Sequence, residues 1–149
     1  MILDAYGIRV QLPRGWSGHL FERHELIGMH VANYPVALAD TSTFGDKSTA
    51  LMRPGKAFVA LVEYRSGNGL EPGQGLYAPR RIPLPLDPTS FGPRRLAHPR
   101  PGQVGTQHFF TAANRPFCAY VVLAGTIAER RPAMAAVNLV LRSLEVEGQ

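Results

Sequence analysis

The residues of this sequence that are able to do chemistry are its histidines, its single cysteine and a cluster of arginines. His19, His24 and His30 fall on neighbouring segments, with Glu22 and Glu25 close by. Converging histidine and carboxylate groups hold zinc, but these five residues have none of the spacings typical of metal sites. Partly exposed strand histidines explain the pattern better, and we predict neither a metal site nor a cofactor.

The single cysteine, Cys118, raises the question of nucleophilic catalysis. His108 lies on the preceding segment and could stand opposite Cys118 in a hairpin, where it would serve as a base. However, the neighbours Phe117, Ala119 and Tyr120 are apolar, and an apolar setting raises the pKa of a thiol. We therefore predict a buried, unreactive thiol. Since G-x-S-x-G and phosphate-loop motifs are also absent, we predict no catalytic residue.

The densest group of chemically capable residues lies in the segment 65–105, which is rich in proline and arginine. Arginine forks and aromatic faces together can hold carboxylates, phosphates or bases. The residues that we predict to bind are Arg80, Arg81, Arg94, Arg95, Arg100, Tyr77 and His98. The competing interpretation is a solvated loop whose arginines only keep the protein in solution.

Strand patterns on either side of this segment predict the elements that would position it. Residues 7–12 alternate between apolar and polar side chains, a pattern typical of a half-exposed strand. A turn at 13–15 leads to a second strand from Trp16 to about His24, and a third runs from Ile27 to about Tyr34. We expect the first two strands to form a hairpin, and the three together to form a meander.

The second half of the chain contains the most apolar strands and the clearest helix. Residues 57–62 and 117–123 are apolar on both faces, which predicts central strands covered above and below. Residues 106–111 precede the second of these and complete a hairpin. A helical stripe of apolar residues closes the chain, formed by Met134, Val137, Leu141 and Leu144.

The start of this terminal helix has two interpretations. Thr126 and Glu129 have the spacing of a capping box, which would start the helix early. Pro132 suits a first helical turn, and we prefer that later start because a proline inside a helix costs about 3 kcal/mol. A second, short helix is expected over 46–52, with Asp46 or Ser48 as its N-cap.

Length and composition bound the class of protein. We predict one α+β domain over residues 1–149, with a mostly antiparallel sheet, a meander, a C-terminal hairpin and helix, and 65–105 as a loop-rich insertion. The net charge of +5 selects no partner by itself. Without a signal peptide or an apolar run of about 18 residues, the chain is expected to be cytoplasmic if it is complete. Homo-oligomerisation is left open.

Three features carry a resemblance to a known group of proteins. Tyr6-Gly7 leads the first strand, residues 13–16 read Pro-Arg-Gly-Trp, and the terminal helix ends in Ser143-Leu144. In these features the chain resembles the PsbP-like superfamily. The resemblance implies an α/β/α sandwich and, because members of that superfamily mostly bind proteins, favours a binding role.

These observations lead to one favoured function and two alternatives. The favoured one is a non-catalytic binding or assembly module that docks an acidic protein partner through the Arg-rich insertion. The first alternative is a small enzyme with a pocket under the insertion and with His108 or His30 as acid or base. The second is weak nucleic-acid binding, which we disfavour because the arginines show no more than partial clustering.

Overall fold

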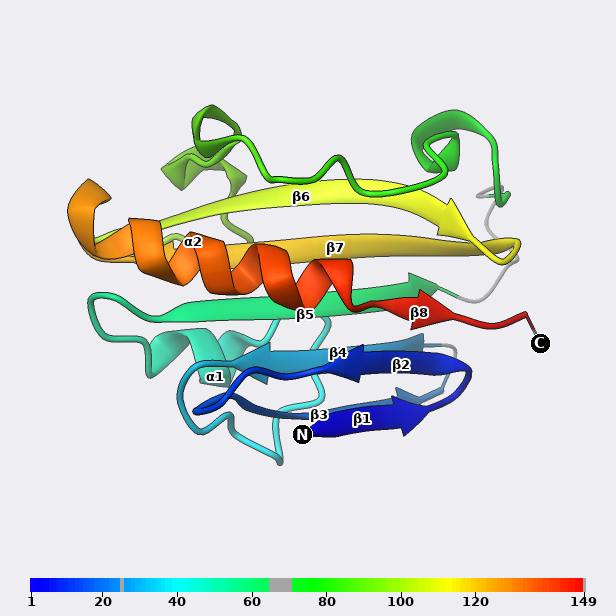
Figure 1. The fold of residues 1–149 in the computed structure, drawn as a ribbon, viewed down its shortest axis with the longest axis horizontal. Helices are drawn as coiled ribbons and strands as arrows, with labels where there is room; N and C mark the ends of the chain where they lie inside the picture. The colour runs from blue at the N-terminus through cyan, green and yellow to red at the C-terminus, as the bar shows by residue number, and fades with distance from the viewer. Residues whose placement is uncertain (25, 65–70, 149) are drawn as a thin grey trace.

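The computed structural model describes residues 1–24, 26–64 and 71–148, in which two antiparallel sheets pack with one long helix (Figure 1). The five-stranded sheet has the order β3-β4-β5-β7-β6, and the three-stranded sheet the order β1-β2-β8. This arrangement confirms the predicted α+β class. The strands are β1 (Ile2–Ala5), β2 (Ile8–Gln11), β3 (Ser17–Arg23), β4 (Leu26–Ala32), β5 (Ala57–Tyr64), β6 (Gln103–Ala112), β7 (Arg115–Ala124) and β8 (Glu145–Val146). The helices are α1 (Asp46–Ala50), α2 (Ile127–Arg142) and the 3-10 helices η1 (Gly75–Tyr77), η2 (Pro88–Ser90) and η3 (Pro93–Arg95).

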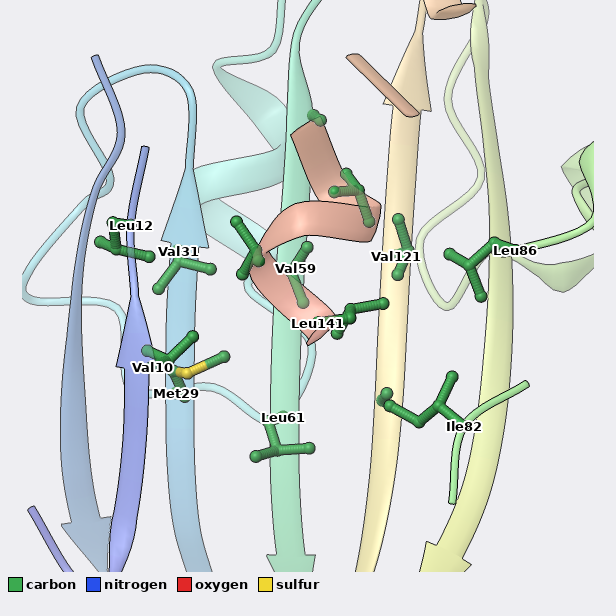
Figure 2. Close-up of a cluster of buried hydrophobic side chains, with 14 of the residues drawn as sticks. Val10, Leu12, Met29, Val31, Val59, Leu61, Ile82, Leu86, Val121 and Leu141 are labelled. Atoms are coloured by element: carbon green, nitrogen blue, oxygen red, sulfur yellow. The ribbon is translucent and has the colours of Figure 1, made fainter. Parts of the chain in front are cut away.

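The core lies mainly between the five-stranded sheet and the layer formed by α2 and the small sheet. Strands β5 and β7 are buried almost throughout, which confirms that both are central. Met29, Leu61 and Ala119 stand side by side across β4, β5 and β7 and belong to this core. Val10 of the small sheet and Leu141 of α2 cover the same face (Figure 2).

The first strands do not form the predicted meander. Tyr6 and Gly7 both have positive φ, 57° and 74°, and they turn the chain between β1 and β2. The partners of β2 are β1 and β8, whereas β3 pairs with β4. The predicted hairpin between residues 7–12 and 16–24 is therefore wrong, because the turn at 13–15 carries the chain from one layer to the other.

Helix α2 begins earlier than we expected. Thr126 is its N-cap and forms a capping box with Glu129, so the preferred start at Pro132 is wrong. Pro132 lies inside the helix, where its ring leaves the carbonyl of Ala128 without its usual donor. Both residues are exposed to solvent, so water can hydrate that carbonyl and the proline is tolerated. Within the described residues, no helix is both long and apolar enough to cross a bilayer.

The opposite face of the five-stranded sheet is covered by residues 33–56 and α1. The N-cap of α1 is Gly45, with a φ of 66°, and not Asp46 or Ser48 as predicted. A more distant residue does the capping: the carboxylate of Asp40 accepts hydrogen bonds from the backbone N–H groups of Lys47 at 2.9 Å and Ser48 at 3.1 Å. The sequence pattern does not predict this cap, because the capping side chain comes from a residue in the preceding loop and not from the residue directly before the helix.

The described part of the insertion contains three short 3-10 helices and is anchored to the sheet by several buried side chains. Ile82 and Leu86 belong to the main core (Figure 2), and Tyr77 and Leu96 are buried. The side chain of Thr111 on β6 anchors the segment by donating to the carbonyl of Tyr77 at 2.6 Å. Because the insertion has no hydrophobic period, the sequence predicts that it adds little to the core. That prediction is wrong, because its apolar anchors are spaced irregularly between prolines. Residues 65–70 of the predicted insertion lie outside the described residues.

Candidate functional site

A groove runs between α2 and the part of the insertion that follows η1. Two adjoining pockets form it, with volumes of about 660 Å³ and 780 Å³, and Pro85 lines both. The insertion runs antiparallel to α2, so residues 80–84 lie beside the end of the helix and residues 88–91 beside its beginning (Figure 1). The groove therefore follows most of the length of α2.

The floor of the groove is apolar. Val104 and Leu123, directly opposed on β6 and β7, lie at the floor of the first pocket, and Phe110 of β6 lines the second. The insertion is fixed to α2 by the backbone N–H of Leu86, which donates to Oδ1 of Asn138 at 2.9 Å. This bond orients the Asn138 amide, whose NH₂ group remains as a donor among the groove-lining groups.

The rim of the groove is cationic. Arg130 and Arg131 lie at one end, and Arg80, Arg81 and Arg142 at the other, whereas no described residue lining either pocket is acidic. The Nε atom of Arg130 is buried and has no hydrogen-bond acceptor among the described residues. A bound carboxylate or phosphate could pair with the guanidinium groups of this rim. The groove is thus suited to an anionic ligand with apolar parts.

The structure does not bring the seven predicted binding residues together. Arg80 and Arg81 line the groove. Tyr77 is buried, with its ring edge-to-face against Phe109 at 5.7 Å between centroids. Its surface is therefore occupied by packing within the protein.

The other four predicted residues lie away from the groove. Arg100 donates to Oδ1 of Asp46 at 2.9 Å, and Nδ1 of His98 lies 3.6 Å from the same oxygen. Both side chains therefore contact the start of α1. Arg94 and Arg95 are exposed on η3. Sequence reasoning missed Arg130, Arg131 and Arg142, because nothing in the local pattern of α2 indicates that its arginines line pockets shared with the insertion.

The histidines do not form a metal site among the described residues, which contain no group of three candidate ligands. His19 and His30 are directly opposed on β3 and β4, and their ring centroids are 5.8 Å apart. The buried His30 donates from Nε2 to the carbonyl of Ser42 at 2.8 Å. Burial lowers the pKa of His30 to about 4, although Asp40 opposes this shift. Glu25 lies outside the described residues.

The Cys118–His108 pair is excluded by the register of the terminal hairpin. His108 stands opposite Ala119, whereas Cys118 stands opposite Phe109. Because neighbouring residues of a strand point to opposite faces, the two side chains lie on different faces of the sheet. Cys118 is fully buried, as predicted, and burial raises the pKa of its thiol to about 12. Burial is the main cause of a lowered pKa of His108, and the positive charge of Arg95 lowers that pKa further.

Comparisons with protein-family models, with curated proteins and with solved structures find no match. The resemblance to the PsbP-like superfamily stays a prediction.

Proposed function

We propose that this protein is a non-catalytic binding module that docks an acidic segment of a protein partner in the groove between α2 and the insertion. The observation that carries the proposal is the lining of the groove, which combines an apolar floor with five arginines and, among the described residues, no carboxylate. Apolar side chains of a partner would cover the floor, while its carboxylates would pair with the arginines.

The chemistry of the groove favours binding over catalysis. The alternative enzyme requires His30 or His108 in a pocket under the insertion, but neither lines the groove. His30 is fully buried, with its Nε2 proton held by Ser42. Among the described residues, the lining contains no histidine, carboxylate, lysine, tyrosine or cysteine, the side chains that commonly act as general acids or bases. The PsbP-like resemblance points in the same direction.

The proposal also differs from one based on charge alone. Arg94 and Arg95 are as exposed as Arg131 and Arg142, but they stand on η3, away from the apolar floor. These two arginine pairs therefore provide matched variants. Reversing either pair changes the net charge equally, while only one change alters the groove.

The test is an array of 12-residue peptides composed of acidic, apolar and serine residues, with a second array in which lysine replaces each acidic residue. We expect wild-type protein to bind acidic peptides, the Arg131→Glu/Arg142→Glu variant to lose them and the Arg94→Glu/Arg95→Glu variant to retain them. Circular dichroism would establish that both variants are folded. Equal loss in both variants, or binding to neither array, contradicts the proposal. Tight binding of a single-stranded oligonucleotide that depends on Arg94 and Arg95 would instead support the nucleic-acid alternative.

A further inference from the structure

The groove is divided into two compartments, of which the first is the pocket of about 660 Å³ beside the start of α2. The hydrogen bond between the Leu86 N–H and Oδ1 of Asn138 joins the insertion to α2 between this pocket and the second one. Beyond Phe91, the backbone groups of Gly92 and Gly105 exchange hydrogen bonds of 3.0 and 3.1 Å, which join the insertion to β6. A chain that enters the first pocket therefore cannot continue along α2 without breaking the Leu86–Asn138 bond.

The lining of the first pocket is mostly apolar. Val104, Leu123 and Leu86 are buried side chains of the main core that also line it, and Met134 of α2 packs against that core. Ile127, at the start of α2, lines the pocket although it is 71% exposed. The volume lies within the range of about 300 to 1,000 Å³ that is typical of ligand pockets. The first pocket is thus large enough to enclose a bulky apolar group.

Two arginines give the first pocket a positive charge. Arg130 and Arg131 both line it, and neither forms an ion pair with any residue that the structure describes. Asp87 and Glu129 neighbour lining residues in the sequence, but each carboxylate accepts a hydrogen bond of 2.9 Å from a backbone N–H at the start of its own helix. The charge of the two guanidinium groups is therefore left for a ligand.

These features together call for a ligand that carries an apolar body and a negative charge close to each other. In a peptide, the side chains of aspartate and glutamate supply the charge but little apolar surface. The last residue of a chain is different, because its α-carboxylate and its side chain are attached to the same carbon atom. A C-terminal leucine or phenylalanine therefore combines both properties, and a chain end suits a compartment through which a chain does not continue.

We infer that the first pocket binds the C-terminus of the partner, with an apolar last residue. The last side chain would pack against Leu123 and Met134, and the α-carboxylate would pair with Arg130 and Arg131. With a pKa of about 3.5, the α-carboxylate is ionised at neutral pH. This inference rests on the proposed function and specifies which part of the acidic segment enters the groove.

The test compares three peptides of equal net charge by fluorescence anisotropy, each labelled on its N-terminus. The first is Asp-Glu-Ser-Gly-Ser-Val-Leu with a free C-terminal carboxylate. The second has an amide in place of that carboxylate and one additional aspartate at its start. The third is Asp-Glu-Val-Leu-Ser-Gly-Ser with a free carboxylate, so that its composition is that of the first but its apolar residues are internal.

We expect the first peptide to bind most tightly. Because an exposed ion pair contributes up to about fivefold in affinity, its preference over the amide should be at least about fivefold for two arginines. Burial of a leucine side chain should give at least about tenfold over the third peptide. Equal affinity for the first peptide and either of the others overturns the inference. Failure of all three peptides overturns it too, and the proposed function falls only if the acidic peptide array also fails.

A pair of tryptophan variants locates the bound peptide. Ala135 is exposed on α2 and lines the first pocket, so Ala135→Trp should obstruct the pocket without changing the core. Ala128→Trp is the matched control, because Ala128 is exposed on the same helix and lines neither pocket. We expect at least about tenfold weaker binding of the first peptide to Ala135→Trp, and a change within about twofold for Ala128→Trp. Equal effects of the two variants contradict the inference.

A second pair of variants identifies the group that recognises the carboxylate. In Arg130→Gln/Arg131→Gln the preference for the free carboxylate over the amide should fall below about twofold, whereas Arg94→Gln/Arg95→Gln should preserve it. Circular dichroism establishes that each variant is folded. An unchanged preference in the first double variant overturns the pairing. Binding of decanoate more tightly than the first peptide would show that the pocket takes a small apolar carboxylate, and would overturn a protein C-terminus as its occupant.

Discussion

Replacement of Arg115 by methionine should destabilise the protein much more than replacement of an exposed arginine such as Arg9. Arg115 forms a two-pronged ion pair with Glu63, with N–O distances of 2.9 Å and 2.7 Å, and both side chains are less than a tenth exposed. The same guanidinium donates to the carbonyl of Tyr6 at 2.9 Å and to that of Glu147 at 2.9 Å. One side chain thus ties β5 and β7 to the turn and the end of the small sheet.

The expected loss of stability comes from Glu63, which would lose its ion-pair partner. Without Arg115, the carboxylate of Glu63 would be buried and unpaired, a change that costs about 3 to 5 kcal/mol. For a protein of this size, that loss corresponds to roughly 10 °C in Tm. The Glu63→Leu/Arg115→Met double variant should lose much less than the sum of the two single variants, because it leaves no buried charge.

Urea denaturation followed through the fluorescence of Trp16, the single tryptophan and a buried residue, provides the measurement. Arg9→Met is the matched control: its contact with Asp4 is 3.8 Å long and both side chains are more than half exposed, so its loss should cost no more than about 1 kcal/mol. A cost below about 1 kcal/mol for Arg115→Met, or additive behaviour of the double variant, would refute the reasoning.

Three further predictions concern the core. Leu141→Ala should lower the free energy of unfolding by about 2 to 5 kcal/mol in the same urea assay, since Leu141 packs between α2 and the sheet. Cys118 should react with a thiol reagent far more slowly in the native protein than in urea, because it is fully buried and its thiol pKa is raised to about 12; similar rates would show that the thiol is accessible. Burial lowers the pKa of His30 to about 4, so as the pH drops the unfolded chain takes up a proton on this residue before the folded protein does. The free energy of unfolding should therefore fall by up to about 3 kcal/mol between about pH 6.5 and about pH 4. A His30→Gln variant should show a smaller fall over this range.

The parts of the fold that local patterns determine could be predicted from the sequence. The unbroken apolar character of β5 and β7 marks them as central strands, and the stripe that includes Val137 and Leu141 marks the face of α2 that meets the sheet. The start of α2 was ambiguous because two local signals competed. The capping box of Thr126 prevailed because Pro132 lies on the exposed side of the helix, where the lost hydrogen bond can be replaced by water.

The features that the sequence left undetermined depend on contacts between distant segments. The alternation in β2 shows that one face is buried, but it does not reveal that β8 is its partner. The groove likewise requires Arg80 and Arg81 to approach Arg142, and the Leu86–Asn138 bond that holds the two segments together spans 52 residues of sequence. The ion pair of Arg115 is likewise invisible to local patterns, since its partner Glu63 comes from another strand.

The small sheet has a consequence for the order in which the protein acquires its structure. Strand β2 contacts the segment that joins α2 to β8. The hydroxyl of Ser143 in this segment accepts a hydrogen bond from the backbone N–H of Gln11, across 132 residues of sequence. Contacts over such distances form slowly, because the entropy of closing the loop must be overcome before they stabilise anything. The hairpins β3–β4 and β6–β7 can pair locally, so they should form first. Until β8 arrives, the backbone groups along that edge of β2 are unpaired, which leaves the edge open to misassembly in the nascent protein.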